Sequence, residues 1–283
     1  MSRSRAATAG VRRTRARPVR ISLVRPLFRF IRWLIRKCWA APLPVRLVAG
    51  LAVIVALFFA VNGLYQAIRK PAVLFFPVSG TLQKTPSETW RQYGPLFREH
   101  STVVMTPELL AALAQVEGAG NPVAQTYWRW RLTWKPLEIY RPASSAVGMY
   151  QITNAAFEEA RRYCIHDHAV AEDGLWNDWR SCWFNDLYTR VIPSHAVEMT
   201  SASLDRSVAG TLGRQGIAAA TLRQKQDLAA VIHLCGPGVG AVYARRGFKA
   251  AAAPRCGDHD VKTYLARVNA MKRYFGWQAA ATQ

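Results

Sequence analysis

Acidic residues are missing from the first 87 positions of the chain. Glu88 is the first of them, whereas 16 Lys or Arg residues precede it, 13 of these within residues 1–46. Residues 88–283 carry 22 basic and 17 acidic groups, a net charge of only +5. The total net charge of +21 therefore belongs mainly to an N-terminal arm. That arm has charge but no element that reads bases, so we expect no nucleic-acid partner.

Long hydrophobic runs are also scarce, because only one exists, and this excludes a multi-span transporter. Residues 47–68 are 22 residues without a charge. At about 1.5 Å per residue, such a helix reaches about 33 Å and can cross a hydrocarbon core of about 30 Å. The excess of Lys and Arg before it predicts that residues 1–46 are a cytoplasmic arm and that the rest is exported. A cleaved signal peptide is the alternative, but the run is too long and no clear small-residue cleavage site follows it.

The arm itself contains a basic, apolar segment at 21–39, in which Arg residues alternate with Leu, Phe and Ile. This pattern is typical of an amphipathic helix that lies on the inner membrane surface. It would attract anionic lipid or a cytoplasmic partner. The simpler interpretation is that the segment only determines membrane topology.

Cysteines are few, and their placement fits export. Cys38 alone falls on the predicted cytoplasmic side, and the four others, an even number, fall on the exported side, as suits an oxidising compartment. We favour the pairs Cys164–Cys182 and Cys235–Cys256, because each closes a short loop. A zinc site is the weaker alternative, since the spacings are not CxxC pairs.

The exported part has no convincing alternation typical of strands. Residues 69–100 hold four prolines and no clear periodicity, and we expect a linker there. A mostly helical domain is predicted over 101–276, large enough for one buried core, with a short tail at 277–283. Beyond the helix described next, the helical patterns fall at about 154–163, 178–190, 204–214, 222–234, 237–246 and 258–275.

Glu117 is the acidic residue that stands out. It ends an apolar helix that begins at Thr106-Pro107 with a hydroxyl cap and a first-turn proline, and that should stop by Gly120. The helix dipole disfavours a carboxylate at this end. A carboxylic acid that keeps its proton can protonate a leaving-group oxygen. An ordinary solvated glutamate is the alternative on this local context alone.

Four short segments place Glu117 in a wider pattern. In chain order they are Glu117-Gly118, residues 148–152 (GMYQI), residues 232–238 (IHLCGPG) and residues 264–268 (YLARV). Together they resemble the SLT-type lytic transglycosylases, relatives of goose-type lysozyme, over about 105–275. The resemblance implies an all-α, lysozyme-like catalytic domain behind a single N-terminal transmembrane helix. It also implies a bacterial inner-membrane location with the catalytic domain in the periplasm.

The family activity gives each motif a role. Glu117 would be the one catalytic acid and base, cleaving the β-1,4 bond between N-acetylmuramic acid and N-acetylglucosamine of peptidoglycan with a 1,6-anhydro product. No cofactor or metal is implied. The residues that the resemblance assigns to glycan binding are Ser145, Gly148, Met149, Tyr150, Gln151, His233 and Tyr264.

The chain departs from the family pattern at three points. The serine that usually follows the glutamate is Gly118, and the usual Tyr-Asn pair is His233-Leu234. The stretch between the first two motifs is longer than usual and rich in aromatic and basic residues at 127–140. That stretch is either one wall of a glycan groove or an insertion that packs on itself or contacts the membrane, an interface that Trp and Tyr favour.

Two other functions stay open. A lysozyme-like hydrolase would need a second acid to position water, and the available candidates are Glu138, Asp167, Asp173 and Asp178. A catalytically weak, peptidoglycan-binding component of an envelope-spanning assembly is the other, favoured by Gly118 and Leu234. A secretion or conjugation machine is a candidate partner, but no residue in the sequence selects one.

Overall fold

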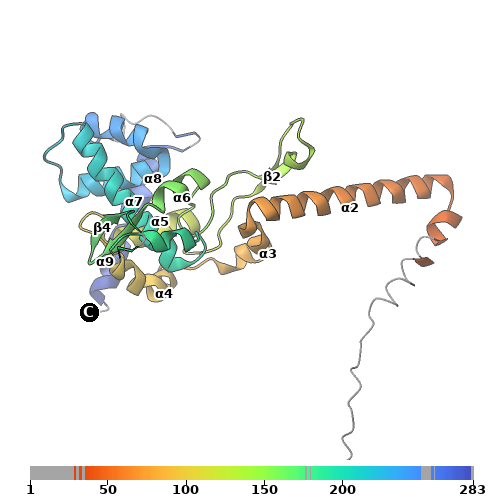
Figure 1. Ribbon diagram of the computed structural model, residues 1–283, viewed down its shortest axis with the longest axis horizontal. Helices are drawn as coiled ribbons and strands as arrows, with labels where there is room; N and C mark the ends of the chain where they lie inside the picture. The colour runs from red at the N-terminus through yellow and green to blue at the C-terminus, as the bar shows by residue number, and fades with distance from the viewer. Residues whose placement is uncertain are drawn as a thin grey trace, which may run out of the picture. The chain divides into compact units, whose positions relative to one another are not determined.

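The structure is a computed structural model that describes residues 29, 32–33, 36–175, 177–178, 180–249, 256–257 and 259–281. Its parts form two compact units, Met1–Ala60 and Val61–Gln283. Helices dominate, with only short strands (Figure 1), in agreement with the expected mostly helical class. The predicted amphipathic helix at 21–39 lies largely outside the described residues.

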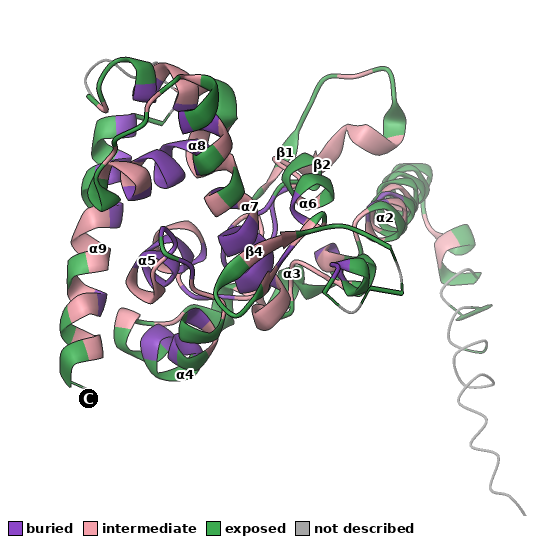
Figure 2. Cartoon of the chain, turned by 60° about the vertical axis from the view of Figure 1, so that its left-hand side comes forward, coloured by how far each residue is buried: buried purple, intermediate pink, exposed green. Residues whose placement is uncertain are grey.

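Helix α2 (Leu43–Arg69) contains the predicted membrane span. It is long and apolar enough to cross a membrane, and most of its apolar side chains are exposed (Figure 2). Helix α8 (Leu222–Arg245) is also long and apolar enough to cross a membrane, but 44 % of its most apolar stretch is buried inside the protein. We therefore interpret α8 as a core helix and α2 as the candidate span.

The core of the second unit surrounds α5 (Pro107–Gly118). Thr106 takes the N-cap position and Pro107 opens the first turn, where its missing N–H costs no hydrogen bond. Six consecutive residues of this helix, Leu109 to Ala114, are buried, because α4 (Pro86–Glu99) and α9 (Val261–Ala281) pack against it. A helix buried on all sides can hold its last turn in a fixed position.

The interpretation of 69–100 as a linker is wrong for most of this segment. Helix α4 begins with a complete capping box between Thr85 and Glu88. Its Trp90, Tyr93 and Phe97 are buried in the core. Shorter helical turns, η1 (Pro71–Phe75), α3 (Phe76–Ser79) and η2 (Gly80–Leu82), fill the chain between α2 and α4. The buried aromatic residues of α4 have the spacing of an amphipathic helix, but Pro86 and Pro95 within the same helix made the segment resemble a linker.

Two small antiparallel hairpins were not expected from the sequence. Strand β1 (Trp128–Trp130) pairs with β2 (Tyr140–Pro142), and the turn η3 (Pro136–Glu138) lies between them. Strand β3 (Tyr163–His166) pairs with β4 (Ala169–Glu172). Strands of three or four residues are too short to produce a recognisable alternation.

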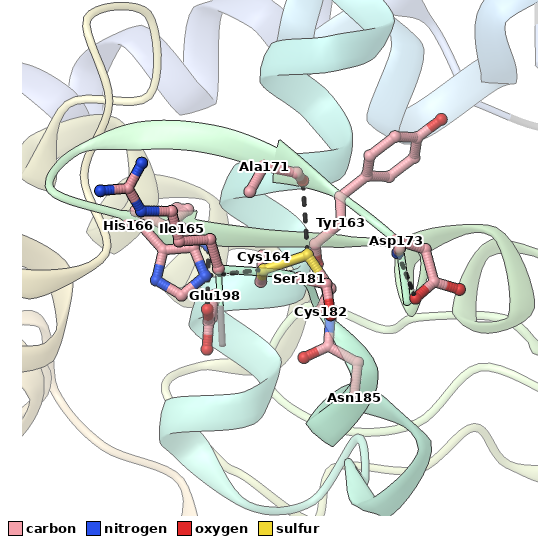
Figure 3. Close-up of a disulfide and its surroundings, with 12 residues drawn as sticks. Tyr163, Cys164, Ile165, His166, Ala171, Asp173, Ser181, Cys182, Asn185 and Glu198 are labelled. Atoms are coloured by element: carbon pink, nitrogen blue, oxygen red, sulfur yellow. Dashed lines mark hydrogen bonds between the residues drawn. A yellow bond between two sulfur atoms is a disulfide. The ribbon is translucent and has the colours of Figure 1, made fainter. Parts of the chain in front are cut away.

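Both predicted disulfides are present, with Cα–Cα distances of 5.5 and 5.4 Å. Cys164–Cys182 joins β3 to the segment that leads into η4 (Trp183–Leu187) (Figure 3). The Glu198 side chain of α7 (Pro193–Arg214) accepts a hydrogen bond from Ile165 N at 2.9 Å. This bond attaches the hairpin to the core, and Cys235–Cys256 attaches α8 to the approach to α9.

Several predicted helices have different boundaries. Residues 154–163 hold the shorter α6 (Asn154–Ala160), and the residues of 178–190 that the structure describes hold only the 3₁₀ turn η4. Helix α7 begins eleven residues before the predicted 204. The two patterns at 222–234 and 237–246 both fall in α8, where Gly236 (φ 80°, ψ 170°) is non-helical and separates two helical parts, in agreement with the two predicted helices. Helix α9 runs to Ala281, so most of the predicted tail is helical.

Candidate active site

Glu117 lies in the last turn of α5, and the local backbone explains why the helix ends there. Ala119 adopts a left-handed conformation (φ 49°) and its N–H bonds back to α5 carbonyls. The Glu117 side chain is 17 % exposed. A partly buried carboxyl group at the end of a rigid helix is therefore accessible from one side only.

Two side chains from distant helices meet Glu117. The Tyr264 hydroxyl of α9 donates to Glu117 Oε1 at 2.5 Å, and His233 Nε2 of α8 lies 3.8 Å from the same oxygen. Burial, and then the Glu117 carboxylate, raise the pKa of Tyr264 well above its ordinary value. Tyr264 thus remains a hydrogen-bond donor at any physiological pH and fixes one oxygen of the carboxyl group. No hydrogen bond reaches Oε2 from any residue in the described ranges.

Close packing explains why position 118 is a glycine. A Cβ atom added there would lie 2.8 Å from both the Cα and the carbonyl oxygen of Met149. Both are backbone atoms, which cannot move as a flexible side chain can. The backbone at 149 therefore takes the space that the side chain of a serine, usual at this position in the transglycosylases that the sequence resembles, would need.

Gly148 and Gln151 form the turn below the site. Gly148 has a φ of +84°, and an added Cβ would lie 2.3 Å from the Arg190 carbonyl oxygen. The glycine is thus required by packing and backbone conformation. The Gln151 amide donates to the carbonyls of Ala124 and Gly148 at 3.1 and 3.0 Å.

Three other predicted binding residues have structural roles. Met149 and Tyr150 are fully buried, and the Tyr150 hydroxyl donates to Leu110 O at 3.2 Å. Their side chains do not reach the surface, so the direct glycan contact expected of them finds no support. Ser145 Oγ accepts from Asn154 N at 3.1 Å, which holds the start of α6.

A cleft of 270 Å³ lies beside this cluster. It is bounded by Gln151 and His233, both predicted site residues. Glu117 does not line the cleft, but its Oε1 lies 3.8 Å from Nε2 of His233, which does. Gly236 and Pro237, at the α8 kink, belong to the motif at 232–238, whereas the lining residues at the N-cap of α6, within α6 and on α7 were missed, among them Thr153, Ala156, Glu159, Thr200, Ser203 and Ser207. The spacing of the three hydroxyl residues of α7 places them on one helix face, which is the signal that could have revealed them.

Glu159 and Thr200 are the most informative of these residues. Glu159 lines the cleft with an exposed carboxylate, and none of the four acids proposed for a hydrolase lines it. Thr200 Oγ1 is buried without a hydrogen-bond partner in the part of the chain that the structure describes. The cleft therefore offers a negative charge at its surface, and Thr200 Oγ1 lies behind that surface as a buried group without a partner in the described part of the chain.

Comparison of the chain with protein-family models, with curated proteins and with solved structures finds no match. Within the described ranges, no group of three or more His, Cys, Asp or Glu side chains could hold a metal ion.

Proposed function

We propose that the chain is a membrane-anchored peptidoglycan lytic transglycosylase with a lysozyme-like catalytic domain. One observation carries the proposal: Glu117 accepts a 2.5 Å hydrogen bond from Tyr264, 147 residues away in sequence. His233 lies at the same carboxyl group. These three residues belong to three of the four segments on which the family resemblance rests. A chance resemblance in sequence order would give these segments no tendency to meet in the fold, so their meeting at one carboxyl group supports the proposal.

The mechanism needs one carboxyl group. Glu117 protonates the glycosidic oxygen between N-acetylmuramic acid and N-acetylglucosamine, and the bond to the muramic C1 breaks. The substrate's N-acetyl group stabilises the positive charge that develops on the sugar. Glu117 then removes the proton of the muramic 6-hydroxyl, whose oxygen bonds to C1 and closes the 1,6-anhydro ring. No water enters, in contrast to the usual pair of carboxylates.

The two carboxyl oxygens of Glu117 have different roles in this mechanism. Tyr264 holds Oε1, and this leaves Oε2 to exchange the proton with the substrate. Burial of α5 keeps the carboxyl group from turning. The side chain's small exposed fraction, 17 %, is consistent with reaction at one face of the carboxyl group.

Substitution of the acid tests the proposal. Glu117→Gln keeps the size of the side chain and an oxygen that Tyr264 can bond, but removes the transferable proton. We expect it to abolish release of soluble muropeptides from purified sacculi, with an unchanged circular dichroism spectrum. Glu108→Gln, the same change in the first turn of the same helix, is the matched control and should retain activity. Wild-type lysis by the Glu117 variant would remove the assignment.

A hydrolase is the second candidate, because Glu159 supplies an acid that lines the cleft. It would position a water molecule against the sugar. Mass spectrometry separates the two reactions, since only a transglycosylase yields anhydro-muropeptides. Reducing ends in the products, lost in Glu159→Gln, would favour the hydrolase. Binding of sacculi without any product would instead favour a wall-binding component of an envelope assembly.

The anchor completes the proposal. Helix α2, with the basic arm before it, would place residues 1–46 in the cytoplasm and the catalytic domain in the periplasm of a bacterial inner membrane. Both disulfides suit that compartment. A secretion or conjugation machine that crosses the envelope would need such an enzyme to open the wall. Co-purification with and without the arm would test that partner.

A further inference from the structure

The β1–β2 hairpin, residues 128–142, carries exposed apolar side chains that the proposed reaction does not use. Leu132 and Trp134, near its tip, are fully exposed, and Trp130 is 63 % exposed. Basic side chains lie among them, with Arg129, Arg131 and Lys135 all exposed. A segment with this composition is costly to leave in water and typical of a membrane-interface contact.

The hairpin is attached to the last turns of α2. Asn62 and Gln66, one helical turn apart on one face, are only 1 % and 7 % exposed. Their side-chain amides both donate to the Leu137 carbonyl, at 3.0 and 2.8 Å. Arg69 adds an ion pair with Glu138 at 3.2 Å. The turn η3 of the hairpin thus covers the polar face at the end of an otherwise apolar helix.

Further bonds hold the base of the same insertion. The Lys70 ammonium donates to the carbonyls of Ser144 and Ala146, at 3.1 and 3.2 Å. Burial, and then the nearby Arg190, lower the pKa of Lys70 to about 8. The Gln125 amide donates to the Ala72 carbonyl. The base of the insertion is therefore bonded to the residues that follow α2, and the η3 turn of the insertion is bonded to the last turns of α2.

These contacts set the level of the hairpin relative to a bilayer. Asn62 precedes Ile68, the last residue of the apolar run, by six residues, or about 9 Å of helix. A polar side chain at that depth is costly in lipid unless protein satisfies it, and Leu137 does so for both amides. If α2 crosses the membrane, as the proposed function holds, η3 lies at the outer headgroup region.

We propose that the β1–β2 hairpin is a second membrane contact, whose tip residues Leu132 and Trp134 enter the lipid interface beside the outer end of α2. The surrounding Arg and Lys side chains bind anionic phospholipid headgroups. A glycan wall is the competing use of this segment. It is disfavoured because no residue of the hairpin lines the cleft.

The consequence is a restriction on where the enzyme works. A single helix lets a periplasmic domain turn and tilt, whereas two contacts fix its orientation. The catalytic domain would then act on the glycan strands that lie close to the membrane. The inference rests on the proposed function only in requiring that α2 spans the membrane.

The test uses the full chain in vesicles of phosphatidylethanolamine and phosphatidylglycerol. Each variant carries Cys38→Ser and one new cysteine labelled with an environment-sensitive fluorophore, without reduction of the disulfides. The three sites are Leu132→Cys at the hairpin tip, Ile54→Cys within α2, and Leu187→Cys as the matched control. Leu187 is a 73 % exposed leucine outside the hairpin. Lipids carrying a nitroxide quencher report contact with the bilayer.

We expect several-fold stronger quenching, with a blue-shifted emission, at 132 and 54 than at 187. Quenching at 54 with none at 132 overturns the second contact while the anchor stands. No quenching at 54 overturns both, and the sacculus assay with Glu117→Gln, which does not depend on lipid, still decides the chemistry. A response at 132 to purified glycan strands in detergent, with no response to lipid quencher, assigns the hairpin to substrate instead.

Discussion

At the scale of single residues, the hydrogen bond from Tyr264 to Glu117 should matter to catalysis more than to folding. Tyr264→Phe removes only the hydroxyl. A hydrogen bond to a charged group contributes about 1.5–3 kcal/mol, so we expect kcat to fall about 10- to 100-fold with KM little changed. Tyr274→Phe is the control, since that hydroxyl instead accepts from Gln278. Equal kcat values for the two variants, measured by muropeptide release, would show that Tyr264 does not position the acid.

Gly118 gives a second prediction, one that runs against the family pattern. Gly118→Ala adds a Cβ that would overlap the Met149 backbone at 2.8 Å. Overpacking of this kind costs about 1–3 kcal/mol, or a drop of several degrees in Tm at about 2–4 °C per kcal/mol. Gly213→Ala in α7 is the control, because no atom lies within 4 Å of its added Cβ. It should gain up to about 1 kcal/mol.

Thermal unfolding in detergent, followed by tryptophan fluorescence, checks this pair of variants. A Gly118 variant as stable as the wild type would mean that the backbone at 149 moves freely. The serine found in the family could then be introduced without cost.

At the scale of secondary-structure elements, α4 is the part whose role changed most between sequence and structure. Phe97 is fully buried among core residues. Phe97→Ala should lower the free energy of unfolding by about 3–5 kcal/mol. Leu82→Ala, at a 41 % exposed position of η2, should change it by less than about 0.5 kcal/mol. Denaturant unfolding of the full chain measures both, and equal small effects would restore the linker interpretation.

The elements that could be predicted are those with local signals. The cap and first-turn proline fixed the start of α5, and the apolar run fixed α2. Elements that depend on tertiary contacts could not be predicted. At 178–190, Cys182 is tied to Cys164 and the Asn185 amide donates to Tyr163 O at 2.7 Å, so these residues follow the β3–β4 hairpin instead of forming an α-helix.

The same distinction applies to the site. Glu117 could be singled out because a lone acid ended an apolar helix, and the motif order pointed to His233 and Tyr264. Met149 and Tyr150 were assigned by motif membership alone, which cannot tell a residue that faces the ligand from one that supports the turn beneath. Thr200 was missed because a hydroxyl in a helix carries no functional signal until its burial is known.

At the scale of the whole molecule, the proposal joins a basic arm, an apolar helix and a disulfide-bonded domain across one membrane. The charge distribution and the cysteine distribution are independent of each other. Both predict a cytoplasmic arm before α2 and an exported domain after it. The arm holds 13 basic residues and Cys38, and the four paired cysteines all follow α2. Topology is therefore the property that a single experiment can decide.

Cys38, which forms no disulfide, makes that experiment direct. In intact spheroplasts it should resist a membrane-impermeant maleimide, because the positive-inside rule predicts a cytoplasmic arm, and it should react once the membrane is permeabilised. Trp277→Cys in a Cys38→Ser background is the control for the other side, since Trp277 is 73 % exposed on α9. This variant should react in intact spheroplasts. Labelling of Cys38 without permeabilisation would place the arm outside, and the catalytic domain could not then reach peptidoglycan.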